Sequence, residues 1–340
     1  MAAPVVFRRR PWGLVVVEGP DATTFLQAVV SQDLVPVPVG GSVASLLLHP
    51  QGKLDVAFRA TRRPAPDGRT GPGRDPRSGD VWWLDTEPTF AARLAESLGR
   101  YRIRVEVDLE DRTGSTSLAS AVAGSGDAGL PGSVPASLPG SVVAIPTRWG
   151  TSPGIDVLGP TDVVEAWVGE SGLAQGDADG FEALRIESGT WRLGVDVDDA
   201  TIPQEAFLEV DGVSFTKGCF IGQELVCRID ARGHVNRFLR RLALPGDDVP
   251  PAGAELVIGD RVVGRVTSAA RVPGESRVVA LAMVRREVEP PAAVAVRWAG
   301  GSRPGEVLAL PERVDGVVRA DGPERVDGAD RVDGADRVVP

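Results

Sequence analysis

The stretch Lys217-Gly218-Cys219-Phe220-Ile221-Gly222-Gln223-Glu224 places one of only two cysteines directly ahead of a predicted helix. Gly222 can cap that helix, and the residues up to Ile229 are good helix formers with apolar side chains on one face. A helix N-terminus and a nearby cation both favour the thiolate, which is the reactive form of cysteine. The pattern therefore predicts either a functional or a packed thiol at Cys219, and it favours core packing for Cys227.

The composition is typical of a soluble globular protein. The chain has 340 residues, of which 42% are apolar and 25% charged, enough for two or three domains with a sizeable core. The net charge of −10 argues against broad binding to nucleic-acid phosphates. A local basic groove stays open, although the pattern favours a solvated face with ion pairs for its five arginines, Arg228, Arg232, Arg237, Arg240 and Arg241.

The sequence predicts neither a membrane span nor a signal peptide. It contains no apolar run of about 18 residues, and the apolar run at residues 14–17 stops at Glu18. The two cysteines lie eight positions apart at one predicted helix, which does not suggest a disulfide framework. We therefore expect a cytoplasmic protein.

Strands and helices alternate in the first third of the chain. Strands are predicted at residues 14–17, 42–48, 54–59, 81–84 and 101–107, and helices after Asp21 and at 89–98. Residues 61–80 are rich in Pro, Gly, Arg and Asp, and residues 111–140 in Gly, Ser, Ala and Pro. Both segments are expected to be flexible loops or linkers.

The composition changes from α+β to all-β after residue 235. Helices are predicted at 162–168 and 181–188, and then short strands at 236–244, 255–258, 262–268, 278–284 and 293–298. This spacing suits a small barrel or sandwich. Residues 311–340 repeat the tetrapeptide Arg-Val-Asp-Gly and are too polar to bury a core, so we expect a disordered tail.

An ordered series of motifs supports a family resemblance. The series comprises residues 181–189 (FEALRIESG), 194–196 (GVD), 202–205 (IPQE) and 217–224 (KGCFIGQE), preceded by 19–21 (GPD), 25–27 (FLQ) and 31–33 (SQD). From about residue 10 to 300, the chain resembles the YgfZ branch of the folate-binding GcvT-like family. The resemblance implies an α+β fold of three domains in a ring. Its domains would be 1–50 with 142–235 as the folate-binding core, 51–141 as a second α+β block, and 236–310 as a closing β-barrel.

The resemblance also implies a function. Members of this branch are implicated in the assembly or repair of iron–sulfur proteins, supported by tetrahydrofolate. The implied partners are a folate and iron–sulfur client or assembly proteins, with no nucleic acid and no membrane. Two alternatives stay open: a folate-dependent aminomethyltransferase or other one-carbon transferase, and a binding scaffold whose folate pocket is vestigial. Whether the chain has catalytic turnover stays open as well.

Four residues are candidate folate contacts. Glu187 resembles the family's pterin-binding glutamate, and a carboxylate can accept both adjacent N–H donors of a pterin. The alternative for Glu187 is a helix-surface pair with Arg185, which could instead orient it. Glu205 could be a second polar contact or a loop acceptor. Asp55 matches one member of an aspartate pair in the glycine-cleavage aminomethyltransferases, but its neighbour here is Val56. That departure weighs against aminomethyl transfer, and an exposed strand-end carboxylate is the alternative.

Cys219 and Lys217 are the candidate reactive residues, because they match the cysteine motif of this branch. The thiol could act in redox chemistry, hold iron or a persulfide transiently, or form a mixed disulfide. Lys217 could lower the thiol pKa or attract an anion, or it could be an ordinary solvated lysine. One cysteine cannot hold a [4Fe–4S] cluster in a monomer. No His and Cys pattern has metal-site spacing, so no tightly held metal is expected.

Overall fold

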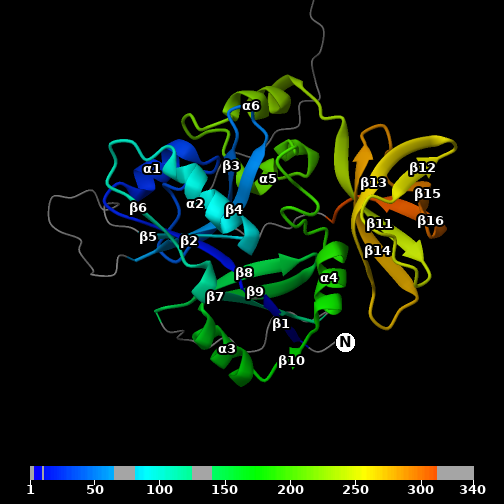
Figure 1. Ribbon diagram of the computed structural model, residues 1–340, viewed down its shortest axis with the longest axis horizontal. Helices are drawn as coiled ribbons and strands as arrows, with labels where there is room; N and C mark the ends of the chain where they lie inside the picture. The colour runs from blue at the N-terminus through cyan, green and yellow to red at the C-terminus, as the bar shows by residue number, and fades with distance from the viewer. Residues whose placement is uncertain (1–3, 10, 65–80, 125–139, 312–340) are drawn as a thin grey trace, which may run out of the picture.

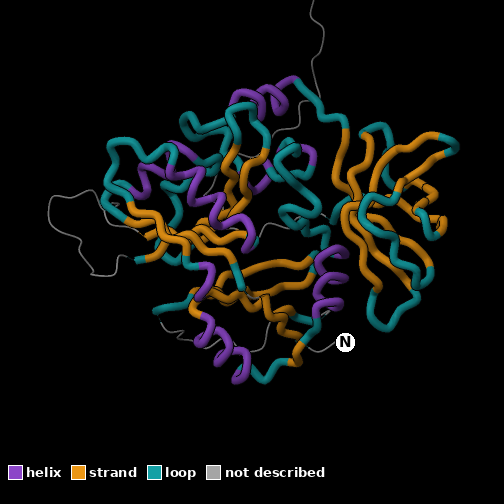
Figure 2. The backbone as a smooth tube through the Cα atoms, in the orientation of Figure 1, coloured by secondary structure: helices purple, strands orange, loops and turns teal. Residues whose placement is uncertain are grey.

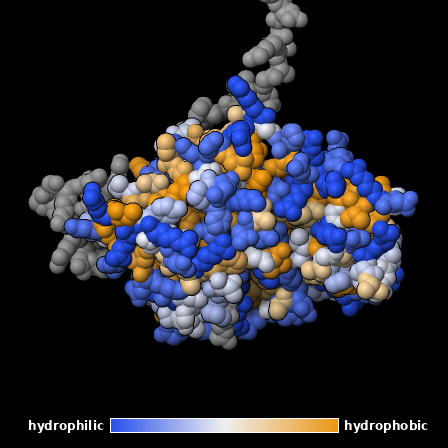
Figure 3. Space-filling model, turned by 45° about the horizontal axis from the view of Figure 1, so that its top comes forward, coloured by the Kyte–Doolittle hydropathy of each residue, from blue (hydrophilic) through white to orange (hydrophobic). Residues whose placement is uncertain are grey.

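A computed structural model describes residues 4–9, 11–64, 81–124 and 140–311. These residues form three units: two five-stranded sheets with their helices, and a closed six-stranded barrel (Figure 1). Among the described residues, none of the helices combines the length and the apolar character that a membrane crossing would need. One face of the molecule is polar over most of its area, with smaller apolar patches over the sheets and the barrel (Figure 3).

The first sheet has the strand order β3-β4-β5-β2-β6. Its strands are β2 (Gly13–Glu18), β3 (Ser42–Leu48), β4 (Leu54–Arg63), β5 (Val81–Thr86) and β6 (Asp108–Asp111). The run of β-branched residues in β2 is buried on both faces, as such a run favours. Helices α1 (Ala22–Val29) and α2 (Ala91–Gly99) bury one apolar side each against this sheet, in one core with its strands.

The second sheet has the strand order β10-β1-β7-β9-β8. Its strands are β1 (Val5–Arg9), β7 (Thr116–Val122), β8 (Val143–Trp149), β9 (Ser152–Pro160) and β10 (Ala174–Gln175). Helix α3 (Thr161–Glu170) packs on β7 and β9. Helix α4 (Ala178–Glu187) begins at Asp177, whose side chain accepts a hydrogen bond from the Gly180 amide, and stands between this sheet and the barrel (Figure 2).

The barrel closes in the order β11-β14-β13-β12-β15-β16. Its strands are β11 (Arg237–Pro245), β12 (Glu255–Ile258), β13 (Arg261–Arg271), β14 (Arg277–Arg285), β15 (Ala292–Trp298) and β16 (Gly301–Leu308). The remaining helical segments are η1 (Pro88–Phe90), η2 (Thr113–Ser115), η3 (Pro203–Glu205), α5 (Glu209–Gly212) and α6 (Gln223–Arg232). Along the barrel strands, buried and exposed residues alternate. The buried ones are small or branched apolar side chains, and they fill the barrel interior.

Each unit contacts the other two, so the three units form a ring. Leu14 and Trp83 of the first sheet share an apolar cluster with Leu118 and Leu158 of the second sheet. Barrel residues, among them Leu239, join the core of the first sheet, and α4 packs on β13 and β14. The predicted α+β fold with a C-terminal β-barrel is confirmed.

The structure divides the strands differently from the predicted blocks. β3 pairs with β4 across the predicted boundary at residues 50 and 51, so residues 13–111 supply one sheet. The predicted strand at 101–107 is absent, and β6 follows it instead. The predicted linker at 111–140 contains β7, a fully buried strand whose small Ser and Ala side chains resemble loop composition. β4 extends to Arg63, and residues 65–80, 125–139 and 312–340 lie outside the described part.

Candidate functional site

The cysteine loop lies ahead of α6, as the sequence predicts. The Cys219 thiol is free and exposed. Gly222 precedes the helix with a φ of +76°, and a Cβ at this position would lie 2.4 Å from the His49 carbonyl oxygen. Only glycine fits this close approach in a left-handed conformation. The loop is therefore fixed against the 49–52 turn while the thiol stays outside. Cys227 is half-buried within α6.

Lys217 makes structural contacts. Its ammonium donates hydrogen bonds to the carbonyl oxygens of Gln27, Val30 and Gln32, at 2.7, 2.6 and 3.2 Å. These carbonyls lie at and just beyond the C-terminal end of α1, where a cation is favourable. Burial lowers the Lys217 pKa to about 8. An effect of this cation on the Cys219 thiol stays a prediction.

Asp55 is buried and paired at the start of β4. Its carboxylate accepts a hydrogen bond from Arg93 Nε and lies 3.7 Å from His49 Nε2. Asp55 is 6% exposed, so it is not an exposed strand-end carboxylate. Val56, the next residue, is fully buried in the core.

Arg185 and Glu187 lie on the last turns of α4 but do not pair with each other in any described contact. Arg185 is 1% exposed, and it donates hydrogen bonds to Asp196 and to the Thr190 carbonyl, both at 2.7 Å. Glu187 is half-exposed, and its Oε1 lies 2.8 Å from an Arg277 nitrogen on β14. The structure thus gives Arg185 an interior role and turns Glu187 toward the barrel.

Glu205 is buried in η3 and forms a two-point ion pair with the barrel. Both of its oxygens accept from the Arg237 guanidinium, at 2.9 and 3.0 Å, and one also accepts from the Ile202 amide. Hydrogen bonding to Glu205 raises the Arg237 pKa. This geometry is that of a strong carboxylate–guanidinium pair.

The predicted site residues therefore fall into two groups. Asp55 and the Cys219 loop adjoin, because Gly52 of the intervening turn packs against Gly222 and Leu225 of α6. Glu187 and Glu205 both reach arginines of the barrel strands. The first group lies around the turn between β3 and β4 and the start of α6. The second group holds the barrel to the rest of the molecule, which we call the body.

A further site, which the sequence did not reveal, lies where β1, the end of β5 and the start of α4 meet. We call it the junction cavity; its volume is about 510 Å³. Its walls include the flat side chains of Phe7, Pro11, Trp12, Pro88 and Phe181. The Arg9 guanidinium lies 4.0 Å from the centre of the Trp12 ring and 4.9 Å from that of Phe181.

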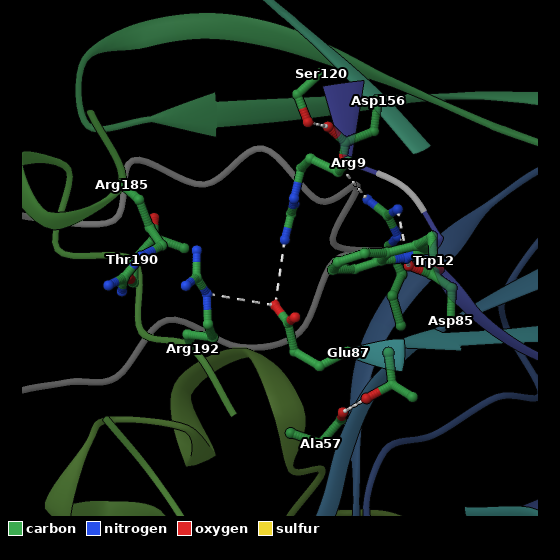
Figure 4. Close-up of polar contacts among 12 residues, drawn as sticks. Arg9, Trp12, Ala57, Asp85, Glu87, Ser120, Asp156, Arg185, Thr190 and Arg192 are labelled. Atoms are coloured by element: carbon green, nitrogen blue, oxygen red, sulfur yellow. Dashed lines mark hydrogen bonds and ion pairs between the residues drawn. The ribbon is translucent and has the colours of Figure 1, made fainter. Parts of the chain in front are cut away.

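Two guanidinium groups converge on one carboxylate in this cavity (Figure 4). Oε1 of Glu87 lies 3.3 Å from Arg9 NH2 and 4.0 Å from Arg192 Nε. Arg192 also donates a 2.6 Å hydrogen bond to Glu182. Burial raises the pKa of Glu87 and lowers that of Arg9. The cavity therefore presents donors and acceptors side by side at an aromatic wall.

Sequence reasoning missed this cavity because its residues come from distant segments. The one local signal is the run at residues 7–12 (FRRRPW), in which three consecutive arginines stand between two aromatic side chains. Among the described residues, no three His, Cys, Asp or Glu side chains converge as a metal site would need.

Comparisons with known proteins agree with this architecture. Residues 237–312 match the model of the glycine cleavage T-protein C-terminal barrel domain. The chain is 27% identical over 306 residues to the tRNA-modifying protein YgfZ of Klebsiella pneumoniae, covering 86% of this chain and 88% of that protein. It is 26% identical over 302 residues to the Escherichia coli (strain SE11) protein of the same name, covering 84% and 87%.

Two aminomethyltransferases are also similar. The Streptomyces avermitilis enzyme is 33% identical over 198 residues, which cover 54% of this chain and 52% of that enzyme. The crystal structure of the glycine cleavage system aminomethyltransferase T from Bartonella henselae shares the fold. Its TM-score is 0.72 at 21% identity, covering 91% of this chain and 86% of that one. The chain is therefore similar to YgfZ proteins over most of its length, its C-terminal barrel matches that of the glycine cleavage T-protein, and it shares the fold of a glycine cleavage aminomethyltransferase.

Proposed function

We propose that this protein binds a reduced folate and supports the assembly or repair of iron–sulfur enzymes through the Cys219 thiol. The observation that carries the proposal is the free, exposed Cys219 at a glycine-fixed helix start. It occurs in a chain that matches YgfZ relatives over most of its length. An exposed thiol is accessible to a protein partner.

The proposed folate contacts lie where the end of α4 meets barrel strands β11 and β14. A pterin needs a carboxylate that accepts two adjacent N–H groups, and the glutamyl tail needs cations. Glu187 is half-exposed, and Arg241 and Arg277 lie beside it: Arg241 donates to the Glu187 carbonyl at 2.8 Å, and Arg277 contacts the carboxylate. We propose Glu187 as the pterin contact. Arg185 would position Glu187 by holding the end of α4. Glu205 would position the barrel arginines beside Glu187, because its ion pair with Arg237 fixes the barrel. A reduced folate would supply a one-carbon carrier at this site.

Cys219 would act on a partner protein rather than on a resident cluster. A single thiolate can form a mixed disulfide, carry a persulfide or hold iron in passing, but it cannot bind a [4Fe–4S] cluster alone. The proposed partners are iron–sulfur client or assembly proteins. The relatives are named tRNA-modifying, and iron–sulfur enzymes that modify tRNA would connect that name to this role. A net charge of −10 disfavours direct contact with tRNA. The reducing cytoplasm would keep such a thiol free.

Aminomethyl transfer is the second candidate, because the match to an aminomethyltransferase reaches 33% identity. Asp55 argues against it: Arg93 neutralises the carboxylate, and the neighbouring position holds the buried Val56. Formation of methylenetetrahydrofolate from an aminomethyl donor would support this candidate over the first.

The thiol role is tested by complementation of cells that lack their own YgfZ relative. Cys219→Ser should fold normally and bind folate like the wild type, yet fail to restore iron–sulfur enzyme activity. Cys227→Ser is the matched control, because it removes the other thiol from the same helix region and should restore activity fully. Full restoration by Cys219→Ser would eliminate the thiol role.

The folate role is tested by calorimetric titration with tetrahydrofolate. Loss of the Glu187 carboxylate in Glu187→Ala should weaken binding by about 1–3 kcal/mol, the usual cost of losing a charged hydrogen-bond partner. Wild-type protein that shows no binding would remove folate from the proposal and leave a scaffold role.

A further inference from the structure

The segment 100–110 (RYRIRVEVDLE) has the sequence of a strand, yet most of it has no strand partner. Its odd-numbered residues are all apolar: Tyr101, Ile103, Val105, Val107 and Leu109. Its even-numbered residues are three cations followed by three acids: Arg100, Arg102, Arg104, Glu106, Asp108 and Glu110. Such strict alternation is typical of a strand with one buried face. In the structure only residues 108–110 of the segment belong to a strand, β6, which is the last strand of the first sheet.

The first half of the segment leaves apolar side chains and an unfavourable backbone conformation at the surface. Ile103 is 71% exposed, and Tyr101 is 37% exposed. Arg104 has a φ of +56°, a left-handed conformation that is unfavourable for a residue with a Cβ. Neither the Arg104 guanidinium nor the Glu106 carboxylate has an ion-pair partner among the described residues. The segment is therefore incompletely satisfied in a single copy of the chain.

The backbone of β6 offers a free edge to a further strand. The even-numbered residues bond toward β2, since the Arg112 amide donates to the Leu14 carbonyl. Similarly, the Glu106 carbonyl accepts a hydrogen bond from the Asp21 amide. In an antiparallel ladder, alternate residues direct their N–H and C=O groups to opposite sides, so the odd-numbered residues face away from β2. β2 is the one strand that pairs with β6 in the described part of the chain, and an unpaired edge is a template for another strand.

We propose that this edge pairs with the same edge of a second copy of the chain, antiparallel and about a two-fold axis at Val105. On the solvent face, this register forms three kinds of cation–acid pair between the copies: Arg100 with Glu110, Arg102 with Asp108, and Arg104 with Glu106. On the core face, it pairs apolar side chains: Tyr101 with Leu109, Ile103 with Val107, and Val105 with Val105. Because the contact is two-fold symmetric, every pair except the central one occurs twice.

The order of charges makes this pairing specific. A parallel pairing in register would place each arginine opposite an arginine, and like charges directly opposite each other are destabilising. A two-residue slip of the antiparallel pairing would place Arg104 or Glu106 opposite itself, according to its direction. A one-residue slip would bring charged side chains to the core face. The proposed register is the one in which all charges and all apolar side chains match.

Pairing requires residues 101–104 to extend. They now form a turn after α2 that is held by local backbone hydrogen bonds, which hydrogen bonds of the new ladder would replace. Ile103 would be covered, and Arg104 would leave its left-handed conformation. Arg102 lies 3.8 Å from Asp108 of its own chain and would exchange this contact for the equivalent one between copies.

The test is sedimentation velocity of the full chain between about 1 and 100 μM, the range of moderate to weak protein association. The wild type should form a dimer as its concentration rises. Arg104→Glu places acid opposite acid in both of its pairs, and Glu106→Arg places cation opposite cation. Each variant alone should dimerise at least about tenfold more weakly than the wild type. An equimolar mixture of the two should restore the dimer, because each variant then faces the opposite charge on the other.

A second pair of variants tests the apolar contact. Ile103→Ser should also weaken the dimer. Ile258→Ser is the matched control, because Ile258 is 43% exposed on β12, outside the segment, and its loss should leave the dimer unchanged. Thermal unfolding establishes that each variant is folded, and the apolar pair of variants decides if a charge reversal prevents folding.

Three outcomes overturn the inference: a wild type that stays monomeric over the whole range, a dimer that both charge reversals retain, and a mixture that stays monomeric. The segment contains none of the residues assigned to the folate and thiol roles. The result is therefore independent of the proposed function.

Discussion

At the scale of single residues, the motif around Lys217 lies where the sequence predicts it, but the contacts of its side chain differ from those expected. The sequence predicts a cation two positions from the thiol, but the ammonium lies among three carbonyl oxygens near the end of α1. The partners of Lys217, Glu187 and Glu205 all come from segments distant in sequence. The position of Cys219 ahead of a helix followed from local pattern, whereas these pairings depend on the tertiary fold and could not be predicted.

Lys217 should make stability depend on pH in the alkaline range. Its folded pKa is about 8 and its unfolded pKa about 10.5, so between these values the unfolded chain binds more protons. The free energy of unfolding of the wild type should therefore rise with pH relative to Lys217→Met. The slope is at most about 1.4 kcal/mol per pH unit, and less because solvent screens the side chain.

Urea denaturation at several pH values from 7.5 to about 10 measures this difference. Lys53→Met is the control, because Lys53 is exposed and its removal should leave the pH dependence unchanged. Parallel curves for wild type and Lys217→Met would contradict the lowered pKa.

At the scale of elements, the longer helices, four strands of the first sheet and five strands of the barrel followed from hydrophobic period and turn residues, whereas none of the five strands of the second sheet was predicted. Helix α6 and the barrel strands are where the pattern predicts them, although β16 was not predicted. β7 was missed because its side chains are small and buried on both faces, which leaves no alternation to detect. The residues at 101–107 alternate like a strand, yet only the adjacent β6 pairs with β2.

The start of α6 should be sensitive to a single methyl group. Gly222→Ala combines a φ of +76° with a contact of 2.4 Å to a backbone oxygen, whereas Gly40→Ala has a φ of +84° and no neighbour within 4 Å. Gly40→Ala should cost about 1 kcal/mol from backbone strain alone. Gly222→Ala should cost at least about 1–2 kcal/mol more, because the helix start must shift. Urea denaturation compares them, and equal costs would show that the close contact relaxes freely.

At the scale of the whole molecule, a polar network on Asp196 joins the barrel to the body. One oxygen accepts hydrogen bonds from Thr267 and Ser268 of β13, and the other accepts from Arg185 and the Arg192 amide. The sequence predicted a terminal barrel from strand spacing, but not the division of strands between the two sheets. That division depends on pairing between distant segments, which one sequence does not specify.

Loss of Asp196 should weaken the attachment of the barrel. Asp196→Ala leaves the buried Arg185 without one of its two carboxylates and should cost about 3 kcal/mol. Calorimetry should then show a broadened or split unfolding transition, since the units no longer unfold together. Asp199→Ala is the control, because its 59% exposed side chain pairs weakly and should cost under about 1 kcal/mol. A single sharp transition in Asp196→Ala would show that the remaining contacts, including the Glu205–Arg237 pair, are enough to hold the units together.

The distribution of the first two strands over different sheets has a consequence for synthesis on the ribosome. β2 needs only partners up to residue 111, so the first sheet can be completed early. β1 precedes β2 in the chain, yet its partners β7 and β10 emerge much later. The nascent chain therefore carries β1 unpaired while the first sheet folds. During that interval the backbone edge of residues 5–9 has no strand to pair with, and an unpaired edge can pair with another chain.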